Sequence, residues 1–228
     1  MTNGNLRKIA AFDFDGTIIK GSSPVRLVNH LLRKGMISPV VCLRLLKWGA
    51  AYKLHLPQTE AHARSLVFTA FEGREKDWVD RFLKDFYVEC IEGAGYIRPA
   101  AVSCMERLVA EGYDVVVVSA TFGPIVEKAM ETLPFSHSIC TEMAVDEHGC
   151  YTTVVDGDCI EGAAKVASLI NYFDQLYGPG NWVLDQAYGD HYSDQDILCF
   201  AQRGFAVSPS YFMGRLARLK HWEILDWD

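Results

Sequence analysis

The ten residues 8–17, KIAAFDFDGT, form the stretch that sets the fold of this chain. Four apolar residues follow Lys8 and lead directly into Asp13, a pattern that indicates a short buried β-strand ending at a polar position. Gly16 and Thr17 then turn the chain. Two carboxylates, Asp13 and Asp15, are therefore expected immediately after a buried strand.

The residues after this strand have helical spacing almost without interruption from 22 to 92. Pro39 and Pro57 suit first helical turns, and Gly35 and Gly73 suit helix ends. The expected helices cover 24–34, 38–53, 58–71 and 75–91. We interpret them as an all-helical unit inserted after the first strand, with a cap at 21–95 and a core made of 1–20 and 96–228.

From Pro99 onward, helices and strands alternate. Residues 114–119 include four consecutive valines, as in a strand that is buried on both faces. Alternating units of this kind predict the α/β class with a doubly wound parallel sheet. The expected elements are helices 99–111, 124–132, 161–177 and 194–202, strands 114–119, 138–144, 182–188 and 204–207, and a hairpin at 145–154.

Composition limits the function. Half of the 228 residues are hydrophobic, which supports a sizeable core, and the net charge of −7 argues against non-specific nucleic-acid binding. The N-terminus has no signal-like segment, and the seven cysteines have no Cys-x-x-Cys spacing, so we expect a reducing cytoplasmic location. The seven histidines also lack metal-ligand spacing. No apolar run reaches the roughly 20 residues of a membrane-spanning helix.

The charge is distributed unevenly. Residues 17–59 contain seven basic residues and no acidic one, whereas the other 15 basic residues share the rest of the chain with all 29 acidic ones. This segment favours a substrate with an anionic or apolar portion. Residues 38–56 could alternatively form an interfacial helix that contacts lipid, although a packed helix pair with a solvated basic face explains the same pattern.

Polar residues occur at three expected strand ends. Asp13 and Asp15 follow the first strand, Ser119 and Thr121 follow the second, and Asp190 and Asp194 follow a later one. Each alone has an ordinary explanation as a turn, a helix cap or a loop. Because ligands bind at the carboxyl ends of parallel strands, their joint occurrence predicts one site.

The chemistry that suits these residues is phosphoryl transfer. Asp13 can attack phosphorus as a nucleophile, and Asp15 can protonate the leaving oxygen and then activate water. Asp13 and Asp190 can ligate Mg²⁺, with Asp194 binding it directly or through water. Ser119 and Lys165 can hold phosphate oxygens. Lys165 follows small residues at the start of a helix, where a lysine is usually only solvated, so its position between the other motifs is what supports this role.

These residues resemble the four motifs of the haloacid dehalogenase superfamily, in order and over residues 8 to about 208. The first motif, residues 13–17, is the most specific, and residues 189–194 resemble the fourth. The resemblance implies a Rossmann-like core, Mg²⁺ dependence, phosphorylation of Asp13 and a metal contact from the Asp15 carbonyl. Thr17 and Ala120 are expected to assist phosphate binding.

Details of the motifs indicate which branch of the superfamily this chain resembles. An aspartate at position 15 favours a phosphatase or a mutase, and the 106 positions between Asp13 and Ser119 leave room for a helical cap of the C1 type. This layout is similar to subfamily IB, the phosphoserine-phosphatase-like branch. Phosphoserine phosphatases typically have a glutamate near the cap entrance, whereas residues 20–23 here contain none. Phosphoserine itself is therefore not the expected substrate.

The expected activity is hydrolysis of a small phosphomonoester, either a metabolite or a lipid-type phosphate. A phosphotransferase of the same fold and a non-catalytic, metal-binding, membrane-associated module are the alternatives. The intact set of Asp13, Asp15, Ser119, Lys165 and Asp190 argues against the second alternative. The sequence predicts neither the natural substrate nor the oligomeric state.

Overall fold

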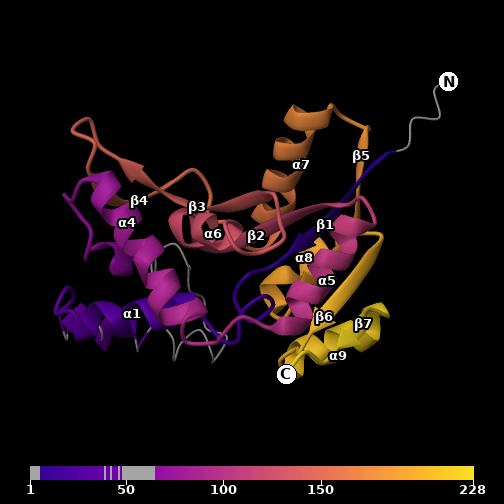
Figure 1. The fold of residues 1–228 in the computed structure, drawn as a ribbon, viewed down its shortest axis with the longest axis horizontal. Coiled ribbons are helices and arrows are strands. Elements are labelled where there is room, and N and C mark those ends of the chain that lie inside the picture. Colours follow the sequence, from indigo (N-terminus) through magenta and orange to yellow (C-terminus); the bar gives the residue numbers. More distant parts are fainter. Residues whose placement is uncertain (1–5, 39, 42, 46, 48–64) are drawn as a thin grey trace.

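The computed structural model describes residues 6–38, 40, 41, 43–45, 47 and 65–228. Within these residues, seven strands form one sheet in the order β4-β3-β2-β1-β5-β6-β7 (Figure 1). Every neighbouring pair is parallel except β3 and β4. The strands are β1 (Arg7–Phe12), β2 (Asp114–Phe122), β3 (His137–Val145), β4 (Tyr151–Asp156), β5 (Trp182–Gly189), β6 (Arg203–Val207) and β7 (Glu223–Leu225).

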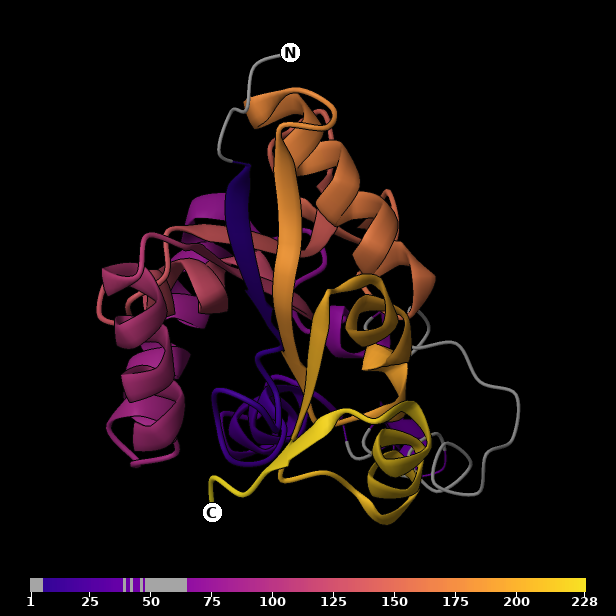
Figure 2. The same ribbon diagram turned by 90° about the vertical axis from the view of Figure 1, so that its right-hand side faces the viewer.

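Helices cover both faces of the sheet, as expected of a doubly wound α/β fold. They are α1 (Ser23–Arg33), α4 (Lys76–Tyr87), the π-helix η1 (Val88–Glu92), α5 (Pro99–Ala110), α6 (Gly123–Met130), α7 (Ala163–Tyr177), the 3₁₀ turn η2 (Tyr192–Asp194), α8 (Gln195–Phe200) and α9 (Tyr211–Lys220). Figure 2 shows the orange and yellow C-terminal helices on one side of the strands and the magenta α5 on the other.

The alternating side chains of β1 divide the core into two layers. Ile9 and Ala11 belong to a cluster with residues of α7, α8 and α9, whereas Ala10 and Phe12 belong to a cluster with residues of α5 and α6. All four side chains are fully buried or nearly so. Burial on both faces explains why this strand is continuously apolar, and the fold class predicted from the sequence is confirmed.

Several boundaries differ from the prediction. The helix expected at 75–91 is α4 followed by the π-helix, and the helix expected at 194–202 is η2 followed by a shorter α8. Strand β2 runs through Phe122 instead of ending at Ser119. Helix α9 and strand β7 were not predicted. β7 has only three residues, too few for a periodic pattern, and it is defined by its parallel pairing with β6.

Every named element between β1 and α5 in the described residues is a helix. Besides α1 and α4, residues 40, 41, 43–45, 47 and 65–68 are helical. Buried side chains on α1 and α4, such as Leu27, Leu31 and Leu83, join the same core cluster as Phe12. Residue 38 and residues 69–71, which were expected at the ends of these helices, are not helical, and the other residues of the helices expected at 38–53 and 58–71 lie outside the described part of the chain.

The β3–β4 hairpin connects this helical segment to the sheet. The Gly73 N–H donates to the Tyr151 carbonyl, and the Tyr151 N–H donates to the Arg74 carbonyl, both at 2.9 Å. The Lys76 N–H donates to the Gly149 carbonyl at 3.0 Å. The Tyr151 hydroxyl donates to Asp80 on α4 at 2.6 Å. The hairpin predicted at 145–154 thus also anchors the start of α4.

None of the helices in the described part of the chain is long and apolar enough to cross a membrane. The proposed lipid contact through 38–56 falls mainly on residues outside that part.

Candidate active site

The strand order places the predicted site residues at one edge of the sheet. β1 lies between β2 and β5. The chain adds β3 beyond β2 on one side of the sheet and β6 beyond β5 on the other. This is a topological switch point, where ligands bind in open α/β sheets. Asp13 follows β1 and its N–H donates to the Tyr188 carbonyl of β5 at 2.9 Å, so Asp13 and Asp190 leave the sheet side by side.

Lys165 joins two of the carboxylates. It lies in the first turn of α7 and is 2% exposed. Its Nζ lies 2.6 Å from Asp13 Oδ1 and 2.6 Å from Asp194 Oδ1. Burial alone would lower the pKa of this ammonium, but the two carboxylates outweigh burial and raise it. Lys165 therefore stays charged beside Asp13 and Asp194.

Three carboxylates could hold a metal ion. Oxygens of Asp13, Asp190 and Asp194 all lie within 4.8 Å of one another. Asp190 Oδ1 is buried and has no hydrogen-bond partner among the described residues. Burial, with the negative charges of Asp13 and Asp194, raises the pKa of Asp190 to about 9. An oxygen-preferring divalent cation would satisfy this unpartnered atom and relieve the repulsion, so the donor set fits Mg²⁺.

Gly16 makes room for this carboxylate. Its φ is +80°, and a Cβ added there would lie 2.1 Å from Asp190 Oδ2. Both the left-handed backbone and the close approach require glycine. The turn in the first motif and the aspartate of the fourth thus depend on each other directly.

Asp15 is held by hydroxyl groups. Asp15 Oδ2 accepts from Ser23 Oγ at 2.9 Å and from Thr121 Oγ1 at 2.5 Å, and Oδ1 accepts from the Ser23 N–H. The two hydroxyls also lie 2.9 Å apart. Ser23 begins α1, and Thr121 lies on β2. Asp15 therefore connects the first helix after β1 to the sheet.

The sequence placed Thr121 with Ser119 among the polar residues at the strand ends but assigned it no role, and it did not indicate Ser23. Thr121 follows Ser119 by two residues at the end of β2. Ser23 gave no comparable signal, because a serine before a proline at a helix start usually has only a capping role.

The other predicted phosphate-binding residues lie on β2 or shortly after its neighbour β1. Ser119 is buried on β2, and its Oγ accepts from the Thr121 N–H at 3.3 Å. Ala120 is half-buried beside it. Thr17 is fully buried, and its Oγ1 has no hydrogen-bond partner among the described residues. Their roles stay predictions.

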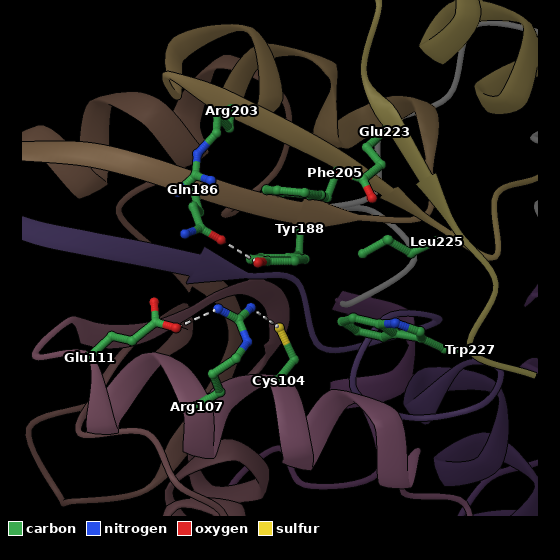
Figure 3. Close-up of a pocket in the computed structure, with 10 residues that line it drawn as sticks. All are labelled: Cys104, Arg107, Glu111, Gln186, Tyr188, Arg203, Phe205, Glu223, Leu225 and Trp227. Carbon is green, nitrogen blue, oxygen red and sulfur yellow. Dashed lines mark hydrogen bonds and ion pairs between the residues drawn. The ribbon is translucent and has the colours of Figure 1, made fainter.

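A cavity of about 380 Å³ lies elsewhere, against β5, β6 and β7 on the face that α5 covers (Figure 3). Its floor includes Tyr188 and Phe205, whose rings stack at 4.6 Å. Arg107 on its wall is paired with Glu111 at 2.9 Å. None of the predicted catalytic, phosphate-binding or metal-binding residues lines this cavity.

The sequence profile of the haloacid dehalogenase-like hydrolase family matches residues 10–198, and the chain belongs to this family of enzymes. It is 26% identical over 230 residues to the "Inhibition of morphological differentiation protein" of Streptomyces azureus, covering 96% of this chain and 78% of that one.

Two solved structures illustrate the similarity of fold. A protein of unknown function from Bordetella pertussis Tohama I superposes with a TM-score of 0.85 at 19% identity, covering 98% of this chain and all of that one. A phosphoserine phosphatase, in a phospho-aspartyl intermediate analogue form, gives 0.65 at 20% identity, with 98% and 95% coverage. The fold is therefore phosphoserine-phosphatase-like.

Proposed function

We propose that this protein is a Mg²⁺-dependent phosphomonoester hydrolase that works through an aspartyl-phosphate on Asp13. The observation that carries the proposal is the position of Asp13, which contacts the Lys165 ammonium at 2.6 Å and shares a cluster with Asp190 and Asp194. A carboxylate between a fixed cation and a candidate metal site is suited to approach an anionic phosphate.

Asp13, Asp190 and Asp194 would hold the metal. When bound, Mg²⁺ would reduce the repulsion between the nucleophile and the phosphate and would stabilise charge on the phosphate oxygens. Lys165 would contribute a second positive charge at the same oxygens, since its Nζ already faces Asp13. The Asp15 carbonyl, Ser119, Thr17 and Ala120 are the further ligand contacts that we propose from the family motifs.

The reaction would proceed in two displacements. An oxygen of Asp13 forms a bond to phosphorus while the bond from phosphorus to the leaving oxygen breaks, and a proton from Asp15 neutralises that oxygen. Asp15 then accepts a proton from water as the water oxygen attacks phosphorus. The bond between phosphorus and Asp13 breaks, which releases inorganic phosphate and restores the carboxylate.

Asp15 is suited to proton transfer because its carboxylate is held in place by hydroxyl groups. Ser23 Oγ and Thr121 Oγ1 both donate to it. Because Ser23 begins α1, movement of the helical segment would change the position of Asp15. We therefore propose that residues 21–95 form a cap over a core of 1–20 and 96–228 and help to exclude water during the reaction.

The substrate that we propose is a small phosphorylated metabolite or a lipid-type phosphate. Similarity to phosphoserine phosphatase supports phosphate-ester chemistry, but residues 20–23 contain no carboxylate to bind a substrate ammonium group. A substrate with an anionic or apolar portion suits the basic segment 17–59 better.

The proposal can be tested with p-nitrophenyl phosphate. We expect turnover that requires added Mg²⁺, is abolished by EDTA and is inhibited by beryllofluoride, which mimics a phosphoryl group on aspartate. Release of inorganic phosphate at the same rate with and without an alcohol acceptor would support hydrolysis, whereas a phosphorylated alcohol would indicate a phosphotransferase. Full activity in EDTA would contradict the proposal. A panel of phosphorylated metabolites and lysophospholipids would then narrow the substrate.

A further inference from the structure

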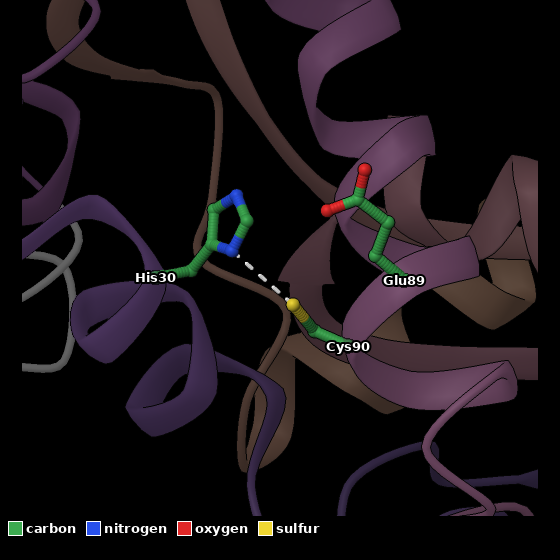
Figure 4. A group of neighbouring side chains, drawn as sticks. All are labelled: His30, Glu89 and Cys90. Carbon is green, nitrogen blue, oxygen red and sulfur yellow. Dashed lines mark hydrogen bonds between the residues drawn. The ribbon is translucent and has the colours of Figure 1, made fainter. Parts of the chain in front are cut away.

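A second cluster of ligand-type side chains lies outside the carboxylate site, between α1 and the π-helix η1. His30 Nδ1 lies 3.2 Å from Cys90 Sγ. These atoms and a carboxylate oxygen of Glu89 all lie within 4.8 Å of one another. Figure 4 shows the side chains of Glu89 and Cys90 extending from η1 toward the imidazole ring on α1.

The local backbone explains how two adjacent residues come to face one histidine. The Gly93 N–H donates to the Val88 carbonyl at 2.8 Å, an i to i−5 bond that widens the turn. Successive side chains are therefore rotated less around the axis than in an α-helix, so Glu89 and Cys90 can both face α1. π-helical turns are rare and often occur at functional sites.

The surroundings favour a bound metal over a solvated polar patch. His30 is 8% exposed, and its ring lies against Phe82 and Phe86 at centroid distances of 5.5 and 5.6 Å. These aromatic rings restrict water on the inner side, while the exposed Glu89 gives access from solvent.

The donor set distinguishes this cluster from the Asp13 site. Imidazole nitrogen, thiolate sulfur and one carboxylate oxygen suit Zn²⁺, whereas three carboxylates suit Mg²⁺. With ordinary Zn–N and Zn–S bond lengths, tetrahedral ligands lie about 3.6 Å apart, so a separation of 3.2 Å requires an adjustment of only about 0.4 Å.

We propose that His30, Glu89 and Cys90 form a zinc-type transition-metal site that joins α1 to η1, with solvent in the fourth position. The Cys90 thiol loses its proton to solvent as its sulfur lone pair forms the bond to the metal. The thiolate and the Glu89 carboxylate balance the two positive charges of the ion.

Cobalt(II) is a suitable probe, because a cobalt–thiolate bond produces an intense near-ultraviolet charge-transfer band that oxygen ligands do not produce. We expect the metal-free full-length protein to bind Co²⁺ with this band, and Zn²⁺ to displace it. The band should disappear in Cys90→Ser. It should persist in Cys199→Ser, which removes an exposed thiol, and in Asp190→Asn, which removes a ligand of the proposed Mg²⁺ site.

Glu89→Gln provides a variant that does not disturb a buried side chain. It should keep the thiolate band but weaken Zn²⁺ binding about ten-fold or more. Zn²⁺ should raise the melting temperature of the wild type and not that of Cys90→Ser, since a ligand stabilises only the state that binds it. Absence of the band, or a band that survives Cys90→Ser, would show that the pair is only a thiol–imidazole hydrogen bond and would overturn the proposal.

Discussion

The two aspartates of the first motif lie two residues apart, yet they have different environments. Asp13 contacts an ammonium group at 2.6 Å and lies among carboxylates of the core. Asp15 accepts hydrogen bonds from the hydroxyl of Thr121 and from the hydroxyl and backbone N–H of Ser23, the first residue of α1. This difference separates their electrostatic surroundings: burial, with the negative charges of Asp194 and Asp15, raises the pKa of Asp13 to about 7 against the opposing Lys165 ammonium, whereas hydroxyl groups and a backbone N–H orient Asp15.

Replacement of Asp13 should have the largest effect on activity. Asp13→Asn removes the nucleophile and keeps the size of the side chain, so hydrolysis of p-nitrophenyl phosphate should fall on the order of 10³-fold or more. Binding of beryllofluoride, followed by fluorine NMR, should also be lost. The exposed Asp77→Asn provides a control for a general loss of charge. Activity close to that of the wild type would exclude Asp13 as the nucleophile.

Replacement of Lys165 tests the ion pairs that it forms with Asp13 and Asp194. Lys165→Met leaves Asp13 and Asp194 without their buried cation, and breaking a buried ion pair typically costs about 3–5 kcal/mol of unfolding free energy. Urea denaturation in EDTA measures this loss. Added Mg²⁺ should recover part of the stability, because it replaces the missing positive charge. A variant as stable as the wild type in EDTA would show that these contacts do not hold the site together.

Replacement of Asp190 tests the unpartnered carboxylate. In the metal-free protein, the pKa of Asp190 near 9 lies above the value of about 4 expected in the unfolded chain. The folded state therefore keeps a proton that the unfolded state gives up, and stability falls as pH rises from about 4 to about 9. Asp190→Asn should show a smaller decline over this range in EDTA, measured as melting temperature.

The same variant also reports on the metal. Mg²⁺ should raise the melting temperature of the wild type more than that of Asp190→Asn, because ligand binding stabilises in proportion to affinity. Equal Mg²⁺ responses in the two proteins would remove Asp190 from the proposed metal site, whatever the pH dependence.

Replacement of the hydroxyl groups that hold Asp15 should give the smallest effects. Ser23→Ala removes one of several hydrogen bonds to Asp15, which corresponds to about 0.5–1.5 kcal/mol of unfolding free energy. Turnover should fall by about ten-fold or less, with Mg²⁺ dependence unchanged, and Thr121→Ser should behave nearly like the wild type. Ser103→Ala on α5 is a matched control on an exposed surface. An altered Mg²⁺ requirement in Ser23→Ala would show that the hydrogen bonds to Asp15 also affect the proposed metal site.

Sequence periodicity was sufficient to predict most strands and helices of the core. The strand 8–13, the valine-rich strand and the alternating helices were predicted to within a few residues because burial on one or two faces leaves a regular pattern. The pattern failed at α9 and β7, where the elements are short and depend on pairing with β6. It also missed the π-helix, since a single widened turn does not change the spacing of apolar residues enough to be seen.

By itself, the sequence determined the order of the chemical groups: Asp13 and Asp15 after the first strand, Lys165 at a helix start, and Asp190 and Asp194 after a later strand. Only the tertiary structure decided which groups meet. It brought Lys165 between two carboxylates, Ser23 and Thr121 onto Asp15, and His30 against Cys90 across 60 positions. Local spacing records which face of an element is buried, but contacts between distant elements follow from how those elements pack together.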